Sequence, residues 1–335
     1  MEENTVKVLV TGANGFIGSH VCHALVSRGH LVRGLAQPGT PLGNLAGLDL
    51  EILEGDVRDR QALGSACAGQ EAIVHLAAIP SDWAPAELIE AVNVGGTRNL
   101  VAAALGAGCR RLVLMSSLAV HRSLGHLGAR EDRPRDRAEM PYALSKIRAE
   151  DLVLDPRLAD RLEGVVIRPG LVPFGPRDRL FSEKACLLLS RGLPMPLVRG
   201  GRTAICTSYV ENLAEGVTLA SERPEAAGEV LVIADEGRPT WAELFGALAG
   251  ALGVRPRFPP VPWAPAHLLA HAMEIIFGAA RLRAAPPLTR YRVDLMRHDF
   301  HFSIERARRL LGYDPKVGLD EGARRTVAWA MGEKG

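Results

Sequence analysis

The stretch TGANGFIGSH, residues 11–20, places glycines at positions 12, 15 and 18 directly after the strand-like run VKVLVT (6–11). Glycine is needed where the backbone turns tightly from a strand into a helix and approaches a bound pyrophosphate, whose charge then lies at the helix N-terminus. The position near residue 10 predicts the first strand-to-helix turn of a dinucleotide-binding fold. The alternative interpretation is a tight turn that binds no ligand.

Short β-branched runs alternate with longer helix-like stretches along the chain. Several runs are apolar throughout, as expected for strands that are covered on both faces. The predicted strands are VKVLVT (6–11), HLVRGLA (30–36), LEIL (50–53), AIVHLAA (72–78), RLVLMSS (111–117), GVVIRPG (164–170) and EVLVIAD (229–235). The predicted helices are 16–28, 86–107 and 141–154. This alternation predicts an α/β protein with a doubly wound parallel sheet, the Rossmann fold.

The alternation loosens after residue 170, where prolines cluster. A smaller and irregular C-terminal lobe is therefore expected beside the sheet. We predict a dinucleotide-binding domain over 1–175, to which 203–235 returns, and a substrate-binding lobe formed by 176–202 and 236–335.

The composition is that of an ordinary globular protein, with 335 residues, 47% hydrophobic, 23% charged and a formal net charge of +2. No single-sign tail favours a nucleic acid as partner. Five scattered cysteines without a C-x-x-C pair favour a reducing cytoplasm and suggest no metal site. The acidic start MEENTVKVLV (1–10) is not a signal-peptide pattern, and no uncharged apolar run reaches about 18 residues, so we expect no membrane-spanning helix.

Tyr142 and Lys146 lie four residues apart in the helix-like stretch EMPYALSKIRAE (139–150). On a helix this spacing brings both side chains to one face. A cation held there favours the tyrosinate, so Tyr142 could exchange a proton near neutral pH. The alternative is a partly buried tyrosine beside a solvated lysine.

Further motifs follow the glycine loop in a fixed order: EGDVRD (54–59), HLAA (75–78), NVGGTRNL (93–100), LMSS (114–117) and PYALSK (141–146). Together they make the first 175 residues resemble the extended short-chain dehydrogenase/reductase family. The resemblance implies that Tyr142 is the general acid/base and Lys146 a ribose ligand that modulates its pKa. It assigns the carbonyl-binding hydroxyl to Ser117, with Ser116 as the fallback. A proton would thus pass through Tyr142 while a nicotinamide passes a hydride.

The resemblance also implies which residues bind the cofactor. Asp56 and Val57 would frame the adenine, Ala77 and Ala78 would border the cleft, and Asn93 would tie strands together through its side chain. The expected cofactor-binding residues are Gly12, Asn14, Gly15, Phe16, Ile17, Gly18, Arg33, Gln37, Asp56, Val57, Leu76, Ala77, Ala78, Asn93, Tyr142, Lys146 and Pro169.

The choice between NAD and NADP depends on the end of the second strand, where NAD-preferring Rossmann enzymes usually place a carboxylate. Ala36 stands where relatives often carry Asp, and Gln37 where phosphate-preferring relatives often carry Arg. The next acid along the chain is Asp49, so no carboxylate would repel a 2′-phosphate, and Arg33 is a candidate to reach one. We expect NADP, with only a slight preference over NAD.

The stretch CTSYVENLAEGV (206–217) resembles the Y-V-x-N/D-L element of the family. Nucleotide-sugar members carry an Arg-Asp pair just before that element, where this chain has Ile205 and Cys206. Losing a fixed guanidinium removes the main anchor of a diphosphate, which disfavours a nucleotide-sugar substrate. Arg199 and Arg202 are candidate substitutes, or solvated loop charges.

The segments PPLTRYRVDLM (286–296) and 300–329 resemble the branch of 3β-hydroxysteroid dehydrogenases, sterol C4-decarboxylating dehydrogenases and reductases of long-chain 3-keto acids. In RPGLVPFGPRD (168–178), the chain is one residue longer than the family pattern, at Pro173, which could reshape the pocket wall.

The apolar-rich stretch 260–289 predicts a helix with one broad apolar face. That face holds Leu268, Leu269, Ala272, Met273, Ile275, Ile276 and Ala280, with His267, His271 and Glu274 opposite. The helix is interpreted as packing against the core, as lining a lipophilic substrate site, or as lying on a membrane surface. The charged stretch GAREDRPRDRAE (128–139) is expected to be a solvated loop, which in the family can rim the active site.

These observations favour an NAD(P)-dependent oxidoreductase that interconverts a hydroxyl and a keto group on a bulky apolar molecule. A 3β-hydroxysteroid, a 4-carboxysterol or a long-chain 3-keto acid would each fit. The alternatives are a nucleotide-sugar epimerase or reductase and a non-catalytic NADP-binding sensor. We expect a cytoplasmic protein, with peripheral membrane contact through 263–280 and a homodimer as further hypotheses.

Overall fold

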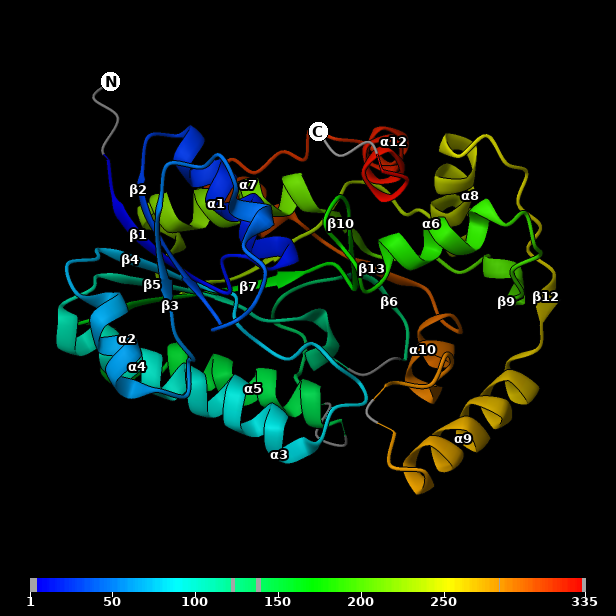
Figure 1. Ribbon diagram of the computed structural model, residues 1–335, viewed down its shortest axis with the longest axis horizontal. Coiled ribbons are helices and arrows are strands. Elements are labelled where there is room, and N and C mark those ends of the chain that lie inside the picture. Colours follow the sequence, from blue (N-terminus) through cyan, green and yellow to red (C-terminus); the bar gives the residue numbers. More distant parts are fainter. Residues whose placement is uncertain (1–4, 122–123, 137–139, 283, 333–335) are drawn as a thin grey trace.

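The computed structural model describes residues 5–121, 124–136, 140–282 and 284–332. Its centre is a seven-stranded parallel sheet in the order β11-β7-β5-β4-β1-β2-β3 (Figure 1). The strands are β1 (Lys7–Thr11), β2 (Leu31–Ala36), β3 (Glu51–Glu54), β4 (Ala72–His75), β5 (Arg111–Met115), β7 (Glu163–Pro169) and β11 (Val230–Ile233). Each predicted strand, including the last one at 229–235, forms one of these, so the expected doubly wound sheet is confirmed.

Helices cover both faces of the sheet (Figure 1). One face carries α1 (Phe16–Ser27) and α7 (Val210–Glu222), and the other carries α2 (Arg60–Cys67), α4 (Gly96–Ala107) and α5 (Pro141–Val153). Successive strand residues contribute to opposite cores: Val10 joins the α1 side and Leu9 the α2 side. This double coverage explains why several of the strands are apolar throughout rather than alternating.

The stretch 86–107, predicted as one helix, contains three consecutive helical segments. These are α3 (Ala86–Ile89), a π-helical segment at Glu90–Gly95, and α4. The wider π turn places Asn93 in the middle of the connection between the end of β4 and α5.

The remaining strands form three small parallel pairs: β8 (Val172–Phe174) with β10 (Thr207–Tyr209), β9 (Leu197–Val198) with β12 (Pro260–Val261), and β6 (His126–Ala129) with β13 (Phe300–Phe302). The helices of this half are α6 (Ser182–Ser190), α8 (Trp241–Ala251), α9 (Trp263–Ala279), α10 (Arg290–Leu295), α11 (Glu305–Leu311) and α12 (Leu319–Ala330). Most of them lie on the right of Figure 1, beside the sheet.

The charged stretch 128–139 is not simply solvated, contrary to expectation. Glu131 is buried, and its carboxylate accepts a 3.1 Å hydrogen bond from the backbone of Val232 and lies 3.6 Å from Arg306. The stretch is tied to β11 and α11 because these contacts satisfy a carboxylate that could not be buried alone. Residues 137–139 lie outside the described residues.

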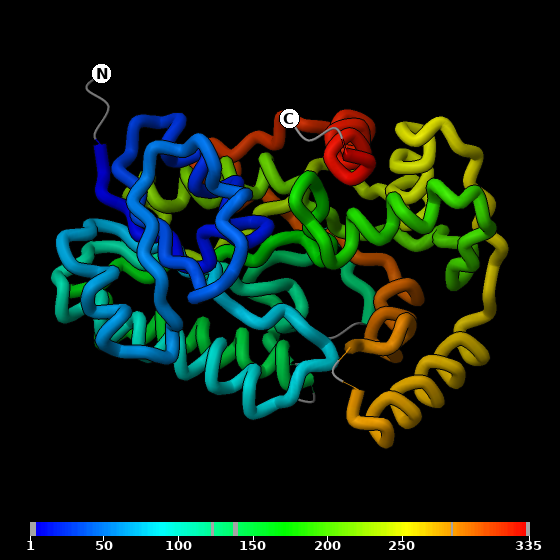
Figure 2. The backbone as a smooth tube through the Cα atoms, in the orientation of Figure 1, coloured from blue at the N-terminus to red at the C-terminus, as the bar shows by residue number. Residues whose placement is uncertain are grey.

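The helix predicted within 260–289 is present as α9. Its large apolar side chains are exposed to solvent, unlike those of a helix that packs against the core. Leu268 and Ile276 are 68% and 62% exposed, and Leu269 and Ile275 are also more than half exposed. The small side chains of Ala266 and Ala270 make the buried contact with the rest of the protein. The interpretation of α9 as a core-packing helix is therefore wrong, because its alanines make the buried contact and its larger side chains face outward. Figure 2 shows α9, in orange, at the periphery.

Within the described ranges, no helix combines the length and the apolar character that crossing a bilayer requires.

Candidate active site

The glycine loop joins β1 to α1 at a point where side chains could not fit. Gly12 has φ +69°, and a Cβ there would lie 2.9 Å from the backbone nitrogen of Ala77. A Cβ on Gly18 would lie 2.1 Å from the carbonyl oxygen of Gly12. Helix α1 begins after Gly15 without a side-chain cap, so its first amides are free to bind an anion.

A cavity of about 430 Å³ adjoins this loop. Of the expected cofactor-binding residues, its walls include Gly12, Asn14, Gly15, Phe16, Ile17, Gly18, Leu76 and Ala78. The other wall residues are Pro80, Met115, the loop at 41–44 and the segment 177–180, none of which was predicted from the sequence to bind the cofactor. Glycines without Cβ atoms and uncapped helix amides fit the pyrophosphate of a dinucleotide.

Asn14 connects two parts of the cavity wall. Its side-chain amide donates to Thr40 Oγ1 at 2.8 Å and to the carbonyl of Pro41 at 3.1 Å. Asn44 donates in return to the carbonyl of Asn14 at 2.9 Å. The loop after β2 is thereby held against the glycine loop, so Asn14 shapes the cavity as well as lining it.

Ser117, Tyr142 and Lys146 come together at the ends of β5 and α5. Ser117 lies close enough to the phenol of Tyr142 to lower its pKa. Lys146 is buried, and its ammonium donates a 2.8 Å hydrogen bond to the carbonyl of Met115. The backbone amide of Ala119 donates to Ser117 Oγ at 3.1 Å, which leaves the serine hydroxyl proton available to donate.

Burial dominates the titration of both groups. It raises the pKa of Tyr142, against the effect of Ser117, and it lowers the pKa of Lys146 to about 8, against the charge of Glu150. The sequence interpretation expected Lys146 to lower the pKa of Tyr142. In this structure desolvation acts directly on the phenol and outweighs any effect of the ammonium, so the pKa is raised instead.

Ser116 faces away from Tyr142, toward a buried ion pair. Its hydroxyl donates to Glu150 at 2.5 Å, and Glu150 receives Arg168 through two bonds of 2.8 and 2.7 Å. Burial would raise the pKa of Glu150, yet the hydrogen bonds and charge of Arg168 lower it. The structure therefore places Ser117, and not the fallback Ser116, beside Tyr142.

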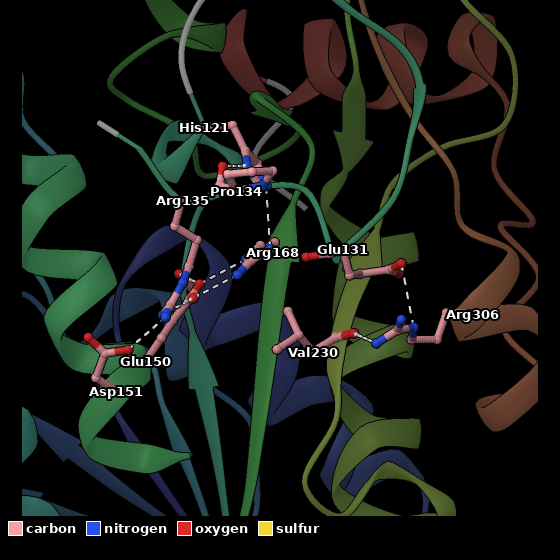
Figure 3. A network of polar contacts seen from close by, with 10 residues as sticks. His121, Glu131, Pro134, Arg135, Glu150, Asp151, Arg168, Val230 and Arg306 are labelled. Atoms are coloured by element: carbon pink, nitrogen blue, oxygen red, sulfur yellow. Dashed lines mark hydrogen bonds and ion pairs between the residues drawn. The ribbon is translucent and has the colours of Figure 1, made fainter. Parts of the chain in front are cut away.

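The ion pair belongs to a larger network that extends from α5 to His121, Glu131 and Arg135 (Figure 3). Arg168 also donates to the carbonyl of Glu131 at 2.9 Å, and it contacts His121 Nε2 at 3.3 Å. Arg135 reaches Glu150 from the other side at 3.1 Å. Removing one member would leave a buried charge unpaired, so this network links α5 and β7 to His121, Glu131 and Arg135.

Several predicted cofactor residues do not reach the cavity. The guanidinium of Arg33 pairs with Glu51 at 2.7 Å and donates to the carbonyls of Ala66 and Ala68. Neither Arg33 nor Gln37 lines the cavity walls. The expectation that Arg33 reaches a 2′-phosphate conflicts with these contacts, because they hold the side chain at the ends of β3 and α2.

The side chains of Asp56, Val57 and Asn93 are engaged within the protein. Asp56 pairs with Arg58 at 2.6 Å, and Val57 is buried. The amide of Asn93 bonds the backbone of Ile79 at 2.8 and 3.3 Å and donates to Ser145 at 3.0 Å. Asn93 thus ties the loop after β4 to α5, and does not tie strands together. Two further predicted cofactor residues lie at the carboxyl edge of the sheet. Pro169 is the last residue of β7. The backbone amide of Ala77, just after β4, donates a hydrogen bond to Thr11 Oγ1.

Just before β10, Ile205 and Cys206 are only 2% and 5% exposed. Burial raises the pKa of the Cys206 thiol to about 12, so it stays neutral. Arg199 and Arg202 are exposed on the surface. The extra residue Pro173 is accommodated within β8, where it lies opposite Ser208 of β10.

A contact that the sequence analysis missed joins the two halves of the chain. Asp82, in the loop after β4, accepts from Thr289 Oγ1 at 2.6 Å and from Arg292 at 3.1 Å. Trp83 donates to the carbonyl of Leu282 at 3.1 Å. The PPLTRY stretch, noted only as a mark of the branch, therefore fastens the C-terminal residues to a loop that borders the cofactor cavity.

Comparison with known proteins agrees with this geometry. The NAD dependent epimerase/dehydratase family matches residues 8–234. The chain is 33% identical over 331 residues to the 2-alkyl-3-oxoalkanoate reductase of Stenotrophomonas maltophilia, covering 96% of this chain and 99% of that protein. It is 32% identical over 328 residues to the 3 beta-hydroxysteroid dehydrogenase/Delta 5→4-isomerase of Mycobacterium tuberculosis, covering 92% and 86%.

The crystal structure of gox2253 is 30% identical in sequence and superposes with a TM-score of 0.79 over 99% of both chains. The expected branch and the expected nicotinamide dinucleotide both agree with the family and with the names of these relatives. The match covers the sheet from β1 to β11, which includes the glycine loop and the Tyr142–Lys146 pair. We conclude that this chain belongs to the NAD dependent epimerase/dehydratase family, within the extended short-chain dehydrogenases/reductases.

Proposed function

We propose that this protein interconverts a hydroxyl and a keto group on a bulky apolar substrate, with NADP or NAD as hydride carrier. The observation that carries the proposal is the placement of Ser117 beside the phenol of Tyr142, with the buried Lys146 on the same helix. Two hydroxyls that converge on one point can both donate to a carbonyl oxygen placed there. The proposed substrate-binding residues are 176–202 and 236–335.

In the direction of reduction, Tyr142 donates its proton to the substrate oxygen, and Ser117 donates a hydrogen bond to the same oxygen. The nicotinamide, when bound, supplies or accepts the hydride. Lys146 provides positive charge that stabilises the tyrosinate left behind. In the direction of oxidation, the tyrosinate accepts the hydroxyl proton, so the same three residues serve both directions.

The residues that precede β10 support the proposed substrate class. Ile205 and Cys206 are buried and uncharged in this structure, which supports an apolar substrate over one that carries a diphosphate. Relatives named as a 2-alkyl-3-oxoalkanoate reductase and as a 3 beta-hydroxysteroid dehydrogenase support the same choice. A 3-keto or 3-hydroxy acid with a long chain, a 3β-hydroxysteroid and a 4-carboxysterol are the proposed candidates.

We further propose that α9 contacts a lipid surface from which an apolar substrate could be drawn. Its support is the exposure of Leu268, Leu269, Ile275 and Ile276 on one helix. An exposed apolar face of this kind is typical of helices that lie in a membrane interface.

A panel of substrates tests the function. It comprises hydroxysteroids, 3-hydroxy acids of graded chain length, flavonoid alcohols and UDP-hexoses. Each is incubated with NAD and with NADP, and formation of the reduced cofactor is measured by its absorbance. UDP-hexoses also need an analysis of epimers, because an epimerase regenerates its cofactor. We expect turnover that rises with the apolar area of the substrate and depends little on salt, and that falls by at least about a hundredfold in Tyr142→Phe.

Epimer formation without turnover of any apolar alcohol would favour the nucleotide-sugar alternative. Dinucleotide binding without turnover of any member of the panel would favour the non-catalytic sensor.

A further inference from the structure

Arg177 lies in the wall of the cofactor cavity, in the segment that follows β8. Its backbone adopts φ +71°, a left-handed conformation that is uncommon for a residue with a Cβ. Such strain is retained where the surrounding structure needs one side chain in one place. The same cavity is lined by the glycine loop.

The guanidinium of Arg177 is only partly satisfied. Its Nη2 donates to His23 Nε2 at 2.9 Å. Its Nη1 is enclosed and has no hydrogen-bond partner among the residues that the structure describes. A buried donor that carries charge is costly without an acceptor.

The carboxylates around Arg177 have other partners. Asp178 accepts the backbone amides of Leu180 and Ser182 and the Ser182 hydroxyl. Glu211 accepts the hydroxyl of Tyr209 at 3.0 Å and pairs with Arg325 at 2.5 Å. Neither carboxylate forms an ion pair with Arg177 in this structure, so the charge of the guanidinium is not neutralised by direct contact.

The two histidines of α1 beside Arg177 do not supply an anion either. His23 accepts the Arg177 bond through Nε2, which requires the neutral imidazole, and its pKa is lowered by burial and by the Arg177 charge. His20 donates from Nε2 to the carbonyl of Pro176 at 3.0 Å, and burial lowers its pKa to about 4. The cavity therefore receives positive potential from Arg177 and from the uncapped start of α1.

We propose that Arg177 is a second anchor for the pyrophosphate of the dinucleotide, opposed to the glycine loop, and that its charge destabilises the protein until that anion is bound. A guanidinium fork matches phosphate oxygens in geometry and charge. The inference concerns the cofactor alone and holds for any substrate.

The experiment compares Arg177→Gln and Arg177→Lys with Arg191→Gln, which removes an exposed arginine outside the cavity walls. Affinities for NADPH and NADH are measured by fluorescence titration, and those for ADP-ribose and adenosine by calorimetry, after removal of co-purified nucleotide. We expect Arg177→Gln to weaken the dinucleotides and ADP-ribose by about 10- to 100-fold and to leave adenosine within about twofold. The affinities of Arg177→Lys for the dinucleotides and ADP-ribose should lie between those of wild type and Arg177→Gln, because lysine keeps the positive charge but lacks the forked guanidinium.

Thermal unfolding provides the second measurement. Without nucleotide, Arg177→Gln should melt at or above the wild-type melting temperature. The increase in melting temperature on adding NADPH should be smaller for Arg177→Gln than for wild type. Unchanged dinucleotide affinity, an equal loss for adenosine, or a variant that fails to fold or melts below wild type would each overturn the proposal. Those results would assign Arg177 a structural role.

Discussion

The ammonium of Lys146 lies 5.9 Å from the centre of the Tyr142 ring, one turn further along α5. The same ammonium is anchored to the carbonyl of Met115 at the end of β5, next to the serine pair at 116 and 117. The strand end and the helix are thus joined at the point where the proton is proposed to move. This relationship leads to the first two predictions.

Replacing Tyr142 by Phe removes only the phenolic oxygen. We expect turnover of the best substrate to fall by at least about a hundredfold, because the group that is proposed to transfer the proton is removed. Dinucleotide affinity, measured by NADPH fluorescence, should stay close to wild type. A Tyr142→Phe enzyme with wild-type turnover would contradict the mechanism.

Replacing Lys146 by Ala should damage both turnover and dinucleotide affinity, since the ammonium is proposed to act on the phenol and on the ribose. The exposed lysine Lys184 of α6 offers a matched control in Lys184→Ala. Steady-state kinetics and fluorescence titration separate the two effects. Loss of turnover with unchanged affinity would remove the proposed contact with the ribose.

The absence of a carboxylate at Ala36 predicts weak discrimination between NADH and NADPH, below about tenfold, with micromolar binding of at least one of them. Ala36→Asp should shift the preference toward NAD, because the carboxylate can hold the ribose hydroxyls and repel a 2′-phosphate. Both affinities are measured for both proteins. An Ala36→Asp variant with an unchanged ratio would show that another residue selects the cofactor.

His75, the last residue of β4, predicts a pH dependence of stability. Its Nδ1 lies 2.7 Å from Thr11 Oγ1 and its Nε2 lies 3.1 Å from Thr97 Oγ1, and burial lowers its pKa to about 3. The unfolded chain binds a proton near pH 6.5, so the neutral histidine stabilises the fold above that pH and the contribution is lost as the pH falls toward 3.

Each pH unit within this window is worth roughly 1.4 kcal/mol. Between pH 6.5 and 5 the wild type should therefore lose about 2 kcal/mol more free energy of unfolding than His75→Gln does. Urea unfolding at both pH values measures the difference, with the exposed His271→Gln as control. Equal losses in wild type and His75→Gln would contradict the assignment.

The exposed face of α9 predicts binding to lipid vesicles. Leu268→Ser combined with Ile276→Ser should reduce co-sedimentation with phosphatidylcholine vesicles, because two exposed apolar anchors are removed. Leu187→Ser, on the exposed side of α6, is the control. Melting temperatures should change little, since none of these side chains is buried. A change from dimer to monomer without any change in vesicle binding would show that a second copy covers this face.

Features that depend on neighbours along the chain could be predicted from the sequence alone. The glycines at 12, 15 and 18 are required by the turn that contains them, and Tyr142 and Lys146 share a face because four residues make about one helical turn. Short β-branched and apolar runs predicted all seven strands of the central sheet, and central strands such as β4 are apolar along most of their length because both of their faces are buried.

Features that depend on distant partners were decided by the tertiary structure. Periodicity identified the apolar face of α9, but not that alanines would make its buried contact and leave Leu268 outside. The charge of Arg33 suggested a phosphate ligand, but the fold places Glu51 beside its guanidinium. Glu131 is buried because the backbone amide of Val232 and the side chain of Arg306 contact its carboxylate. A sequence specifies which side chains share a face or carry a charge, whereas the free energy of burying them depends on what the remote parts of the chain bring into contact.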